Sequence, residues 1–168
     1  TASGVSPMAV PGIAGGQYVA DGLEHMPSGR PSSMAEDHQE QLDKRERKLD
    51  GNDFGDYWSE VVGKGNIAII TWGSATGPSR DAQARAIEEG HKVKLISLRL
   101  LLPAQVDKFH KEMEGVEKVL VVEQSHSRQF HQYLRAHYDL PKDVKVFARP
   151  GPLPIRPVEI YQNLVNWS

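Results

Sequence analysis

The sequence predicts a Rossmann-like, doubly wound α/β domain from Asn66 to the end of the chain, preceded by an irregular segment and one helix. Short apolar runs alternate here with stretches whose apolar residues recur at helical spacing. Pro and Gly stand at the boundaries between these stretches. Because each helix must return the chain to the same edge of the sheet, the strands are expected to be parallel and joined by right-handed crossovers.

Four apolar runs are the expected strands. Residues 67–72 form a continuous run that ends at Gly73, which is the pattern of a strand buried on both faces. Residues 93–98 and 119–123 are expected to form the next two strands. Residues 144–148 are expected to form a shorter strand at one edge of the sheet.

A helix is expected after each strand. Pro78 stands where a first helical residue is preferred, and Gly90 stands where the C′ residue of the same helix is expected. Pro103 and Pro157 open two further helices. Small residues suit a helix that lies close to the sheet. The residues expected to face inward are Ala82, Ala84, Ala86, Ile87, Val106, Phe109, Met113, Phe130, Tyr133, Leu134, Tyr138, Ile160, Tyr161, Leu164 and Val165.

The first 65 residues have a different character. Ser, Pro and Gly dominate up to Ser33, yet this segment carries large apolar side chains such as Tyr18, Leu23 and Met26. It shows no amphipathic period and cannot bury a core of its own, so we expect it to pack on neighbouring protein. A charged helix is expected to start at Ser33, with Glu36 completing a capping box. The expected parts are therefore residues 1–32, a connector helix and linker over 33–65, and the α/β domain over 66–168.

Composition excludes several classes of function. Lys plus Arg number 20 and Asp plus Glu number 22, and no block of basic residues stands out. We therefore expect neither nucleic acid nor a membrane as a partner. The lack of Cys removes disulfides, thiolate metal sites and cysteine nucleophiles from this chain, and it fits a cytoplasmic protein. Neither a membrane span nor a signal peptide is expected.

In open parallel sheets, ligands bind beyond the carboxyl ends of the strands. The polar candidates at these ends are Ser74, Arg99, Glu123 and Arg149. The loop at residues 73–78 lacks the G-x-G-x-x-G pattern and has no Lys, and its last residue is a Pro without an amide donor. A tight turn is therefore expected there rather than a phosphate site.

The strand-end Glu123 has both a catalytic and a structural interpretation. A carboxylate near His126 can perform acid–base chemistry. Alternatively, such a Glu forms an ion pair with an Arg, for which Arg99 and Arg149 are available, or caps a loop amide.

The histidines do not predict a metal site. His126, His131 and His137 fall on different faces of any helix, which excludes a shared ion. His25, beside Glu24 in the irregular segment, is either a functional loop residue or a structurally satisfied histidine.

Short residue strings follow one another in a characteristic order along nearly the whole chain. The early strings are Gly4-Val5-Ser6-Pro7, Pro11-Gly12, Gly22-Leu23-Glu24-His25 with Gly29, and Asp43-Lys44-Arg45-Glu46-Arg47-Lys48-Leu49. The later strings are Thr71-Trp72-Gly73-Ser74 with Gly77, Gly90-His91-Lys92-Val93, Leu102-Pro103, Val121-Val122-Glu123-Gln124 with Gln129, and Pro150-Gly151-Pro152-Leu153-Pro154. Together they resemble the alpha subunit of 2-oxoacid:ferredoxin oxidoreductases, especially the 2-oxoglutarate type. The later set resembles the domain of that subunit that is similar to the C-terminal domain of transketolase.

This resemblance implies a thiamine-diphosphate enzyme that decarboxylates a 2-oxoacid, passes electrons through a [4Fe-4S] cluster to ferredoxin, and transfers the acyl group to coenzyme A. It implies a thiamine pyrimidine domain before Thr1, with residues 1–32 as its tail, and a beta subunit that carries the diphosphate and cluster ligands. Thiamine diphosphate, Mg²⁺ and the cluster are then not bound by this chain alone. Under this hypothesis Ser6 and His25 are candidates for the rim of the active site, and no catalytic residue is assigned.

Two loops depart from the family pattern. Met8 stands where many relatives have Arg after the Ser-Pro pair. Ser125 to Arg128 stand where relatives have an Asn-Xaa-Xaa-Gly pattern after the strand-end Glu-Gln. A second hypothesis, of a different class, is a free-standing Rossmann-like module that binds a nucleotide or an acyl-CoA.

Overall fold

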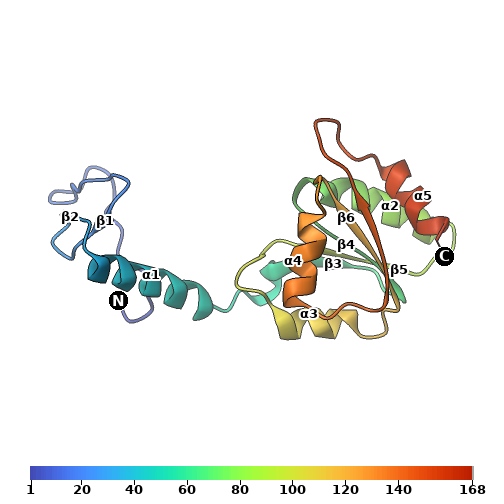
Figure 1. Cartoon of the computed structure of the whole chain (residues 1–168), viewed down its shortest axis with the longest axis horizontal. Coiled ribbons are helices and arrows are strands. Elements are labelled where there is room, and N and C mark those ends of the chain that lie inside the picture. The colour runs from blue at the N-terminus through green and yellow to red at the C-terminus, as the bar shows by residue number, and fades with distance from the viewer. Residues whose placement is uncertain (168) are drawn as a thin grey trace. The chain divides into compact units, whose positions relative to one another are not determined.

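The computed structural model describes residues 1–167 and divides the chain into two compact units, Thr1–Asp53 and the part from Phe54 onward (Figure 1). The second unit contains the sheet and both hydrophobic cores.

The second unit is built on a five-stranded sheet with the order β3-β5-β4-β6-β7. Four of its strands are parallel, as predicted. They are β4 (Ile67–Trp72), β5 (Val93–Leu98), β6 (Lys118–Glu123) and β7 (Asp143–Ala148). The predicted edge position of the last strand is confirmed, because β7 pairs with β6 alone in this order.

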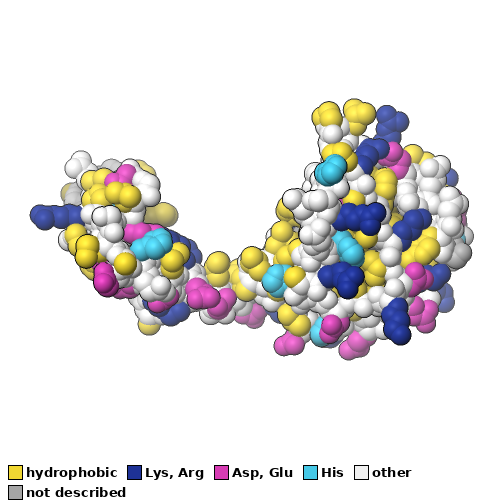
Figure 2. Space-filling model, in the orientation of Figure 1, with side chains coloured by type: hydrophobic (Ala, Val, Ile, Leu, Met, Phe, Trp, Pro, Cys, Tyr) yellow, Lys and Arg dark blue, Asp and Glu magenta, His cyan; other side chains and the backbone are white. Residues whose placement is uncertain are grey.

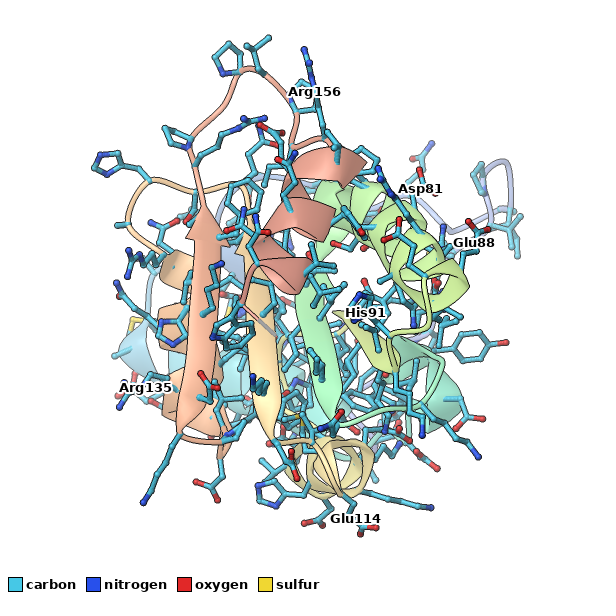
Figure 3. All side chains as sticks on the ribbon, turned by 90° about the vertical axis from the view of Figure 1, so that its right-hand side faces the viewer. Asp81, Glu88, His91, Glu114, Arg135 and Arg156 are labelled. Carbon is cyan, nitrogen blue, oxygen red and sulfur yellow. The ribbon has the colours of Figure 1, made fainter. Side chains whose placement is uncertain are left out.

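Helices cover both faces of this sheet, which confirms the doubly wound architecture (Figure 1). One face carries α2 (Thr76–Glu88) and α5 (Pro157–Val165), which cross the side of the sheet that faces the viewer in Figure 3. The other face carries α3 (Val106–Met113) and α4 (Gln129–His137). Side chains that alternate along the strands divide between the two cores, with Ile69 in the first and Ile70 in the second.

The predicted end of α2 is confirmed, and its predicted start is wrong. Gly90 has φ 91°, and the amides of Gly90 and His91 bond the carbonyls of Ile87 and Ala86, which is a Schellman ending. The helix begins at Thr76, however, directly after the short 3₁₀ turn η2 (Gly73–Ala75), so Pro78 is its third residue.

The expected inward face of α2 is partly wrong. Ala84 and Ile87 are exposed, and Gln83 is buried in their place. The Gln83 amide donates hydrogen bonds of 2.7 and 3.0 Å to the carbonyls of Val62 and Val93. A polar side chain with buried partners can therefore occupy a core position that sequence periodicity assigns to apolar residues.

The α/β unit starts earlier than the sequence indicated. The 3₁₀ turn η1 (Gly55–Trp58) leads into β3 (Ser59–Val62), which pairs antiparallel with β5. The sequence analysis assigned these residues to a linker. Trp58 is 5% exposed and packs in the core beside α3 and α4, so the α/β unit begins at Phe54 rather than at residue 66.

The first unit consists of a two-residue antiparallel pairing, β1 (Glu24–His25) with β2 (Pro31–Ser32), followed by α1 (Ala35–Asp50). The predicted capping box at Ser33 is wrong. The N-cap of α1 is Met34, without a side-chain cap, and the Met34 amide donates to the hydroxyl of Ser32 at 3.1 Å. Pairing of Ser32 in β2 places that hydroxyl, rather than the next one, beside the start of the helix.

Candidate functional site

The carboxyl ends of β4 to β7 hold the four strand-end residues that the sequence singled out. Ser74 lies in η2, after Gly73, whose φ is 61°. The Ser74 side chain is exposed, whereas Thr76 turns inward and its hydroxyl lies 2.6 Å from that of Ser97 on β5. The first loop is thus a tight connection between β4 and α2, as expected.

Glu123, at the end of β6, is 1% exposed and holds the start of α4. Its carboxylate accepts hydrogen bonds from the amides of Phe130 and His131, at 2.9 and 3.0 Å, and from the Ser125 hydroxyl at 2.6 Å. A carboxylate at free amides of a helix N-terminus satisfies donors that lack helical partners and complements the helix dipole. Glu123 therefore has a structural contact, as one interpretation expected, but its partners are amides in the first turn of α4 and not an Arg or a loop amide.

Arg99 is held by a carboxylate on β3. Its guanidinium donates to Glu60 at 2.9 Å, and Arg80 donates to the other Glu60 oxygen at 2.6 Å. The Arg80 hydrogen bond lowers the pKa of the Glu60 carboxyl most, and the Arg99 hydrogen bond also lowers it, against the effect of burial. These three residues tie β3 to α2 and to the end of β5.

Arg149 is held by the start of α5. It donates to the Glu159 carboxylate at 2.6 Å and to the Pro154 carbonyl at 2.5 Å. The pKa of Glu159 is lowered first by its hydrogen bond from the Arg156 amide, then by Arg149. Each charged strand-end residue thus has its own internal partners, and His126, which is exposed, is not among the donors to Glu123.

The two candidates of the first unit also have local contacts. The Ser6 hydroxyl accepts a hydrogen bond from Lys44 of α1 at 3.2 Å. The His25 Nε2 atom lies 3.2 Å from Asp21 but makes no hydrogen bond and is shielded from solvent. Its neighbour Glu24 accepts hydrogen bonds from Arg45, which lower the pKa of the Glu24 carboxyl. His25 therefore has a solvent-shielded nitrogen that lies near the Asp21 carboxylate but makes no hydrogen bond.

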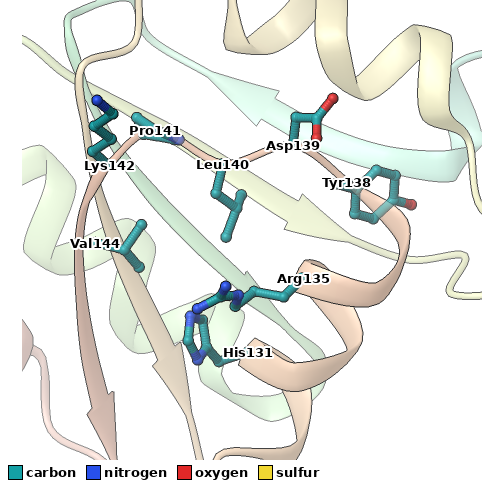
Figure 4. A pocket seen from close by; sticks show the side chains of 8 residues that line it. All are labelled: His131, Arg135, Tyr138, Asp139, Leu140, Pro141, Lys142 and Val144. Atoms are coloured by element: carbon teal, nitrogen blue, oxygen red, sulfur yellow. The ribbon is translucent and has the colours of Figure 1, made fainter.

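The sequence analysis missed a pocket on the α3 and α4 side of the sheet. It lies between α4 and the start of β7, has a volume of about 500 Å³, and includes His131, Arg135 and Lys142 in its lining (Figure 4). A signal was available, since residues four apart on a helix share a face, as His131 and Arg135 do. The approach of Lys142 to this face depends on the turn between α4 and β7.

From these features the protein is classed as a Rossmann-like α/β unit joined to an irregular unit. The charged side chains at the strand ends of the α/β unit have partners within it, and the irregular unit has few buried side chains. Solved structures agree with the fold. The inactive beta4 tetramer of a split-gene transketolase matches 68% of this chain with a TM-score of 0.52 and 13% identity, covering 42% of that chain. At this identity the match supports the fold alone.

Sequence comparison then identifies the family. No protein-family model matches the sequence. The alpha subunit of 2-oxoacid:ferredoxin oxidoreductase 2 from Aeropyrum pernix is 32% identical over 155 residues, which are 88% of this chain and 24% of that subunit. The alpha subunit of the Saccharolobus solfataricus enzyme is 33% identical over 140 residues, 80% of this chain and 22% of that subunit.

A solved structure matches nearly the whole chain. It is the 2-oxoglutarate:ferredoxin oxidoreductase from Magnetococcus marinus with 2-oxoglutarate, coenzyme A and succinyl-CoA bound. The match covers 99% of this chain and 29% of that chain, with 32% identity and a TM-score of 0.73. The chain belongs to the 2-oxoacid:ferredoxin oxidoreductase alpha-subunit family, and it spans about a quarter of the length of the curated relatives it matches.

Proposed function

We propose that this chain is part of a thiamine-diphosphate-dependent 2-oxoglutarate:ferredoxin oxidoreductase. In this reaction a 2-oxoacid loses CO₂, two electrons pass to ferredoxin, and the acyl group forms a thioester with coenzyme A. The observation that carries the proposal is the match to the Magnetococcus marinus enzyme over 99% of the chain, which includes the irregular first unit as well as the α/β unit.

Within such an enzyme, we assign this chain a structural and subunit-organising role. Its strand-end charges have internal partners: Glu123 holds α4, Arg99 holds β3, and Arg149 holds α5. These contacts position elements of the fold and leave no unpaired strand-end carboxylate for acid–base chemistry among residues 1–167. The role fits a cytoplasmic assembly with the remainder of an alpha subunit and a beta subunit.

The donor set of this chain does not suit the cofactors of the proposed reaction. These 168 residues contain no Cys, so thiolate ligands of a [4Fe-4S] cluster must come from outside them. Within the described part of the chain, no group of three or more His, Asp or Glu side chains is arranged to hold a metal ion. We therefore expect thiamine diphosphate, Mg²⁺ and the cluster to be bound outside this chain.

No helix of residues 1–167 is both long and apolar enough to cross a membrane.

Ser6 and His25 are proposed to lie at the rim of the active site of the whole assembly. The support for His25 is its shielded Nε2 atom, which has no hydrogen-bond partner within residues 1–167 and is available to a group supplied by another part of the enzyme. The alternative of a free-standing nucleotide or acyl-CoA module gains no such support, because the β4–α2 loop is a tight turn and Pro78 lacks an amide donor.

The test is purification of the native assembly through an affinity tag on this chain. The purified assembly should contain a thiamine pyrimidine domain and a cysteine-containing subunit. The assembly should reduce ferredoxin when supplied with both 2-oxoglutarate and coenzyme A, and removal of the tagged chain from an extract should remove this activity. Activity with pyruvate but none with 2-oxoglutarate would refute the proposed substrate. Recovery of the chain without any other polypeptide would refute its proposed role in the assembly.

A further inference from the structure

The pocket between α4 and β7 carries positive charge that the protein does not neutralise. Arg135 and Lys142 line it, are exposed, and have no acidic partner among residues 1–167. Its one acidic lining residue, Asp139, has a side chain that is 96% exposed and lies 3.5 Å from His110 of α3. Lys and Arg side chains gather over α4 and β7 in the space-filling view (Figure 2).

The pocket also has a fixed wall. The His131 amide is bonded to the buried Glu123 carboxylate, which anchors the first turn of α4. Figure 4 shows the Arg135 side chain reaching from α4 to the ring of His131, with Leu140 and Val144 beside them. The pocket therefore combines two nitrogen donors on one helix face with apolar side chains from the α4–β7 turn and from β7.

The state of His131 fits a donor to an anion. Burial lowers the pKa of the imidazole most, the charges of Arg135 and Arg128 lower it further, and Glu123 raises it. A neutral imidazole offers one N–H donor next to the fixed fork of a guanidinium. Arg in this arrangement recognises phosphate or carboxylate groups by paired hydrogen bonds.

We propose that the α4–β7 pocket binds a small organic anion. Arg135 and His131 donate hydrogen bonds to its phosphate or carboxylate group, Lys142 adds charge at the rim, and Leu140 and Val144 contact its carbon skeleton. A volume of about 500 Å³ suits a ligand of this class. Lys142 directly precedes β7 and Val144 lies near its start, at the opposite end of this strand from Arg149. The proposal does not depend on the proposed function.

The test is an NMR titration of the whole chain at constant pH and ionic strength with phenyl phosphate and with benzoate. At least one probe should shift the His131 ring and Arg135 side-chain signals saturably. Arg135→Gln should weaken that binding at least about tenfold, since it removes charge-assisted hydrogen bonds to the anion. Lys142→Gln should weaken it less, and Lys111→Gln, which removes an exposed cation of α3 outside the pocket, should leave it unchanged.

Comparison of the probes identifies the ligand chemistry. Tighter binding of phenyl phosphate assigns a phosphorylated ligand, and tighter binding of benzoate assigns a carboxylate. Inorganic phosphate tests whether the apolar side chains of the pocket contribute to binding. It should bind more weakly than phenyl phosphate, because it has no carbon skeleton to contact them. Absence of saturable shifts with both aromatic probes overturns the proposal, and so does equal weakening by Lys111→Gln and Arg135→Gln, which would indicate only general charge attraction. The spectra of the variants report on folding directly.

Discussion

At the scale of single residues, the loop from β6 to α4 shows how one buried carboxylate organises a connection. Glu123 replaces the missing side-chain cap of α4, whose N-cap residue, Arg128, has no capping side chain. Arg128 itself has φ 56° and ψ 43°, in the left-handed region. It is the last residue of the segment where the family resemblance places Asn-Xaa-Xaa-Gly. A glycine adopts this backbone conformation without the steric cost that a side chain imposes.

Arg128→Gly should therefore stabilise the chain. The left-handed conformation costs an L-residue about 1–2 kcal/mol, and the greater freedom of Gly in the unfolded chain offsets part of this, so a net gain of about 0.5–1 kcal/mol is expected. Urea unfolding of the whole chain measures it. Arg128→Ala is the matched control, because it removes the same charge and keeps the strain. A gain of equal size in the Ala variant would show that the charge, not the backbone, is responsible.

At the scale of secondary-structure elements, β3 depends on polar as well as apolar contacts. Its Glu60 side chain is 19% exposed and bridges Arg80 and Arg99, which are 50% and 53% exposed. Solvent screens such half-exposed pairs, so their contribution to stability is below about 1 kcal/mol. The buried Gln83 amide adds a second polar contact between α2 and this strand.

The Glu60 contacts should make β3 docking sensitive to acid. The folded-state pKa of Glu60 is lowered from its ordinary value of 4.5, chiefly by the Arg80 hydrogen bond. Its stabilisation is therefore complete above pH 4.5 and is lost as the pH falls through the lower folded-state value. Glu60→Gln should be less stable than the native chain at pH 7, and the difference should shrink below pH 4.5 in urea unfolding. A difference that stays constant down to pH 3 would contradict this account.

The irregular segment before α1 is the element with the least internal support. Met8 is 90% exposed, Tyr18 76% and Leu23 57%. Burying side chains of this size contributes about 1.5–3 kcal/mol each, so their exposure in the isolated chain indicates a missing surface. We propose that this segment packs on neighbouring protein in the complete enzyme, with Tyr18, Leu23 and Met26 as apolar anchors.

Hydrogen exchange can test this packing. Amides of residues 1–26 should exchange rapidly in the isolated chain and slowly in the intact assembly. Tyr18→Ser should weaken the protection within the assembly, whereas Gln17→Ser, at the adjacent exposed position, should not. Fast exchange throughout residues 1–26 of the intact assembly would show that the segment has no docking surface, and the proposal for His25 would fail with it.

At the scale of the whole molecule, we propose that the cofactors of the reaction bind outside residues 1–168. The unit from Phe54 onward has two cores of its own and can fold on them, but the chain has no motif for a diphosphate. Calorimetric titration of the isolated chain with thiamine diphosphate and Mg²⁺ should therefore show no saturable heat, while the intact assembly should show it. Saturable binding by the isolated chain would contradict the proposal that the cofactor binds outside these residues.

The parallel strands at the centre of the sheet could be predicted from the sequence alone. The apolar runs of β4 and β6 and the four apolar residues of β5 are typical of strands inside a parallel sheet. The Schellman ending at Gly90 and the start of α5 at Pro157 depend on local backbone chemistry. Ordered residue strings also determined the family, because they reflect descent and not packing.

Contacts between residues far apart in the sequence could not be predicted and are known from the three-dimensional structure alone. β3 has two apolar residues in four and becomes a strand because β5 offers a free edge, while Gln83 is buried because the carbonyls of Val62 and Val93 meet its amide. Likewise, Glu123 bonds to the amides of α4 and not to a neighbouring Arg. Lys142 lines the same pocket as Arg135 because of the fold of the chain between α4 and β7. Local sequence carries no record of such partners, because the free energy of each contact depends on groups supplied by other elements.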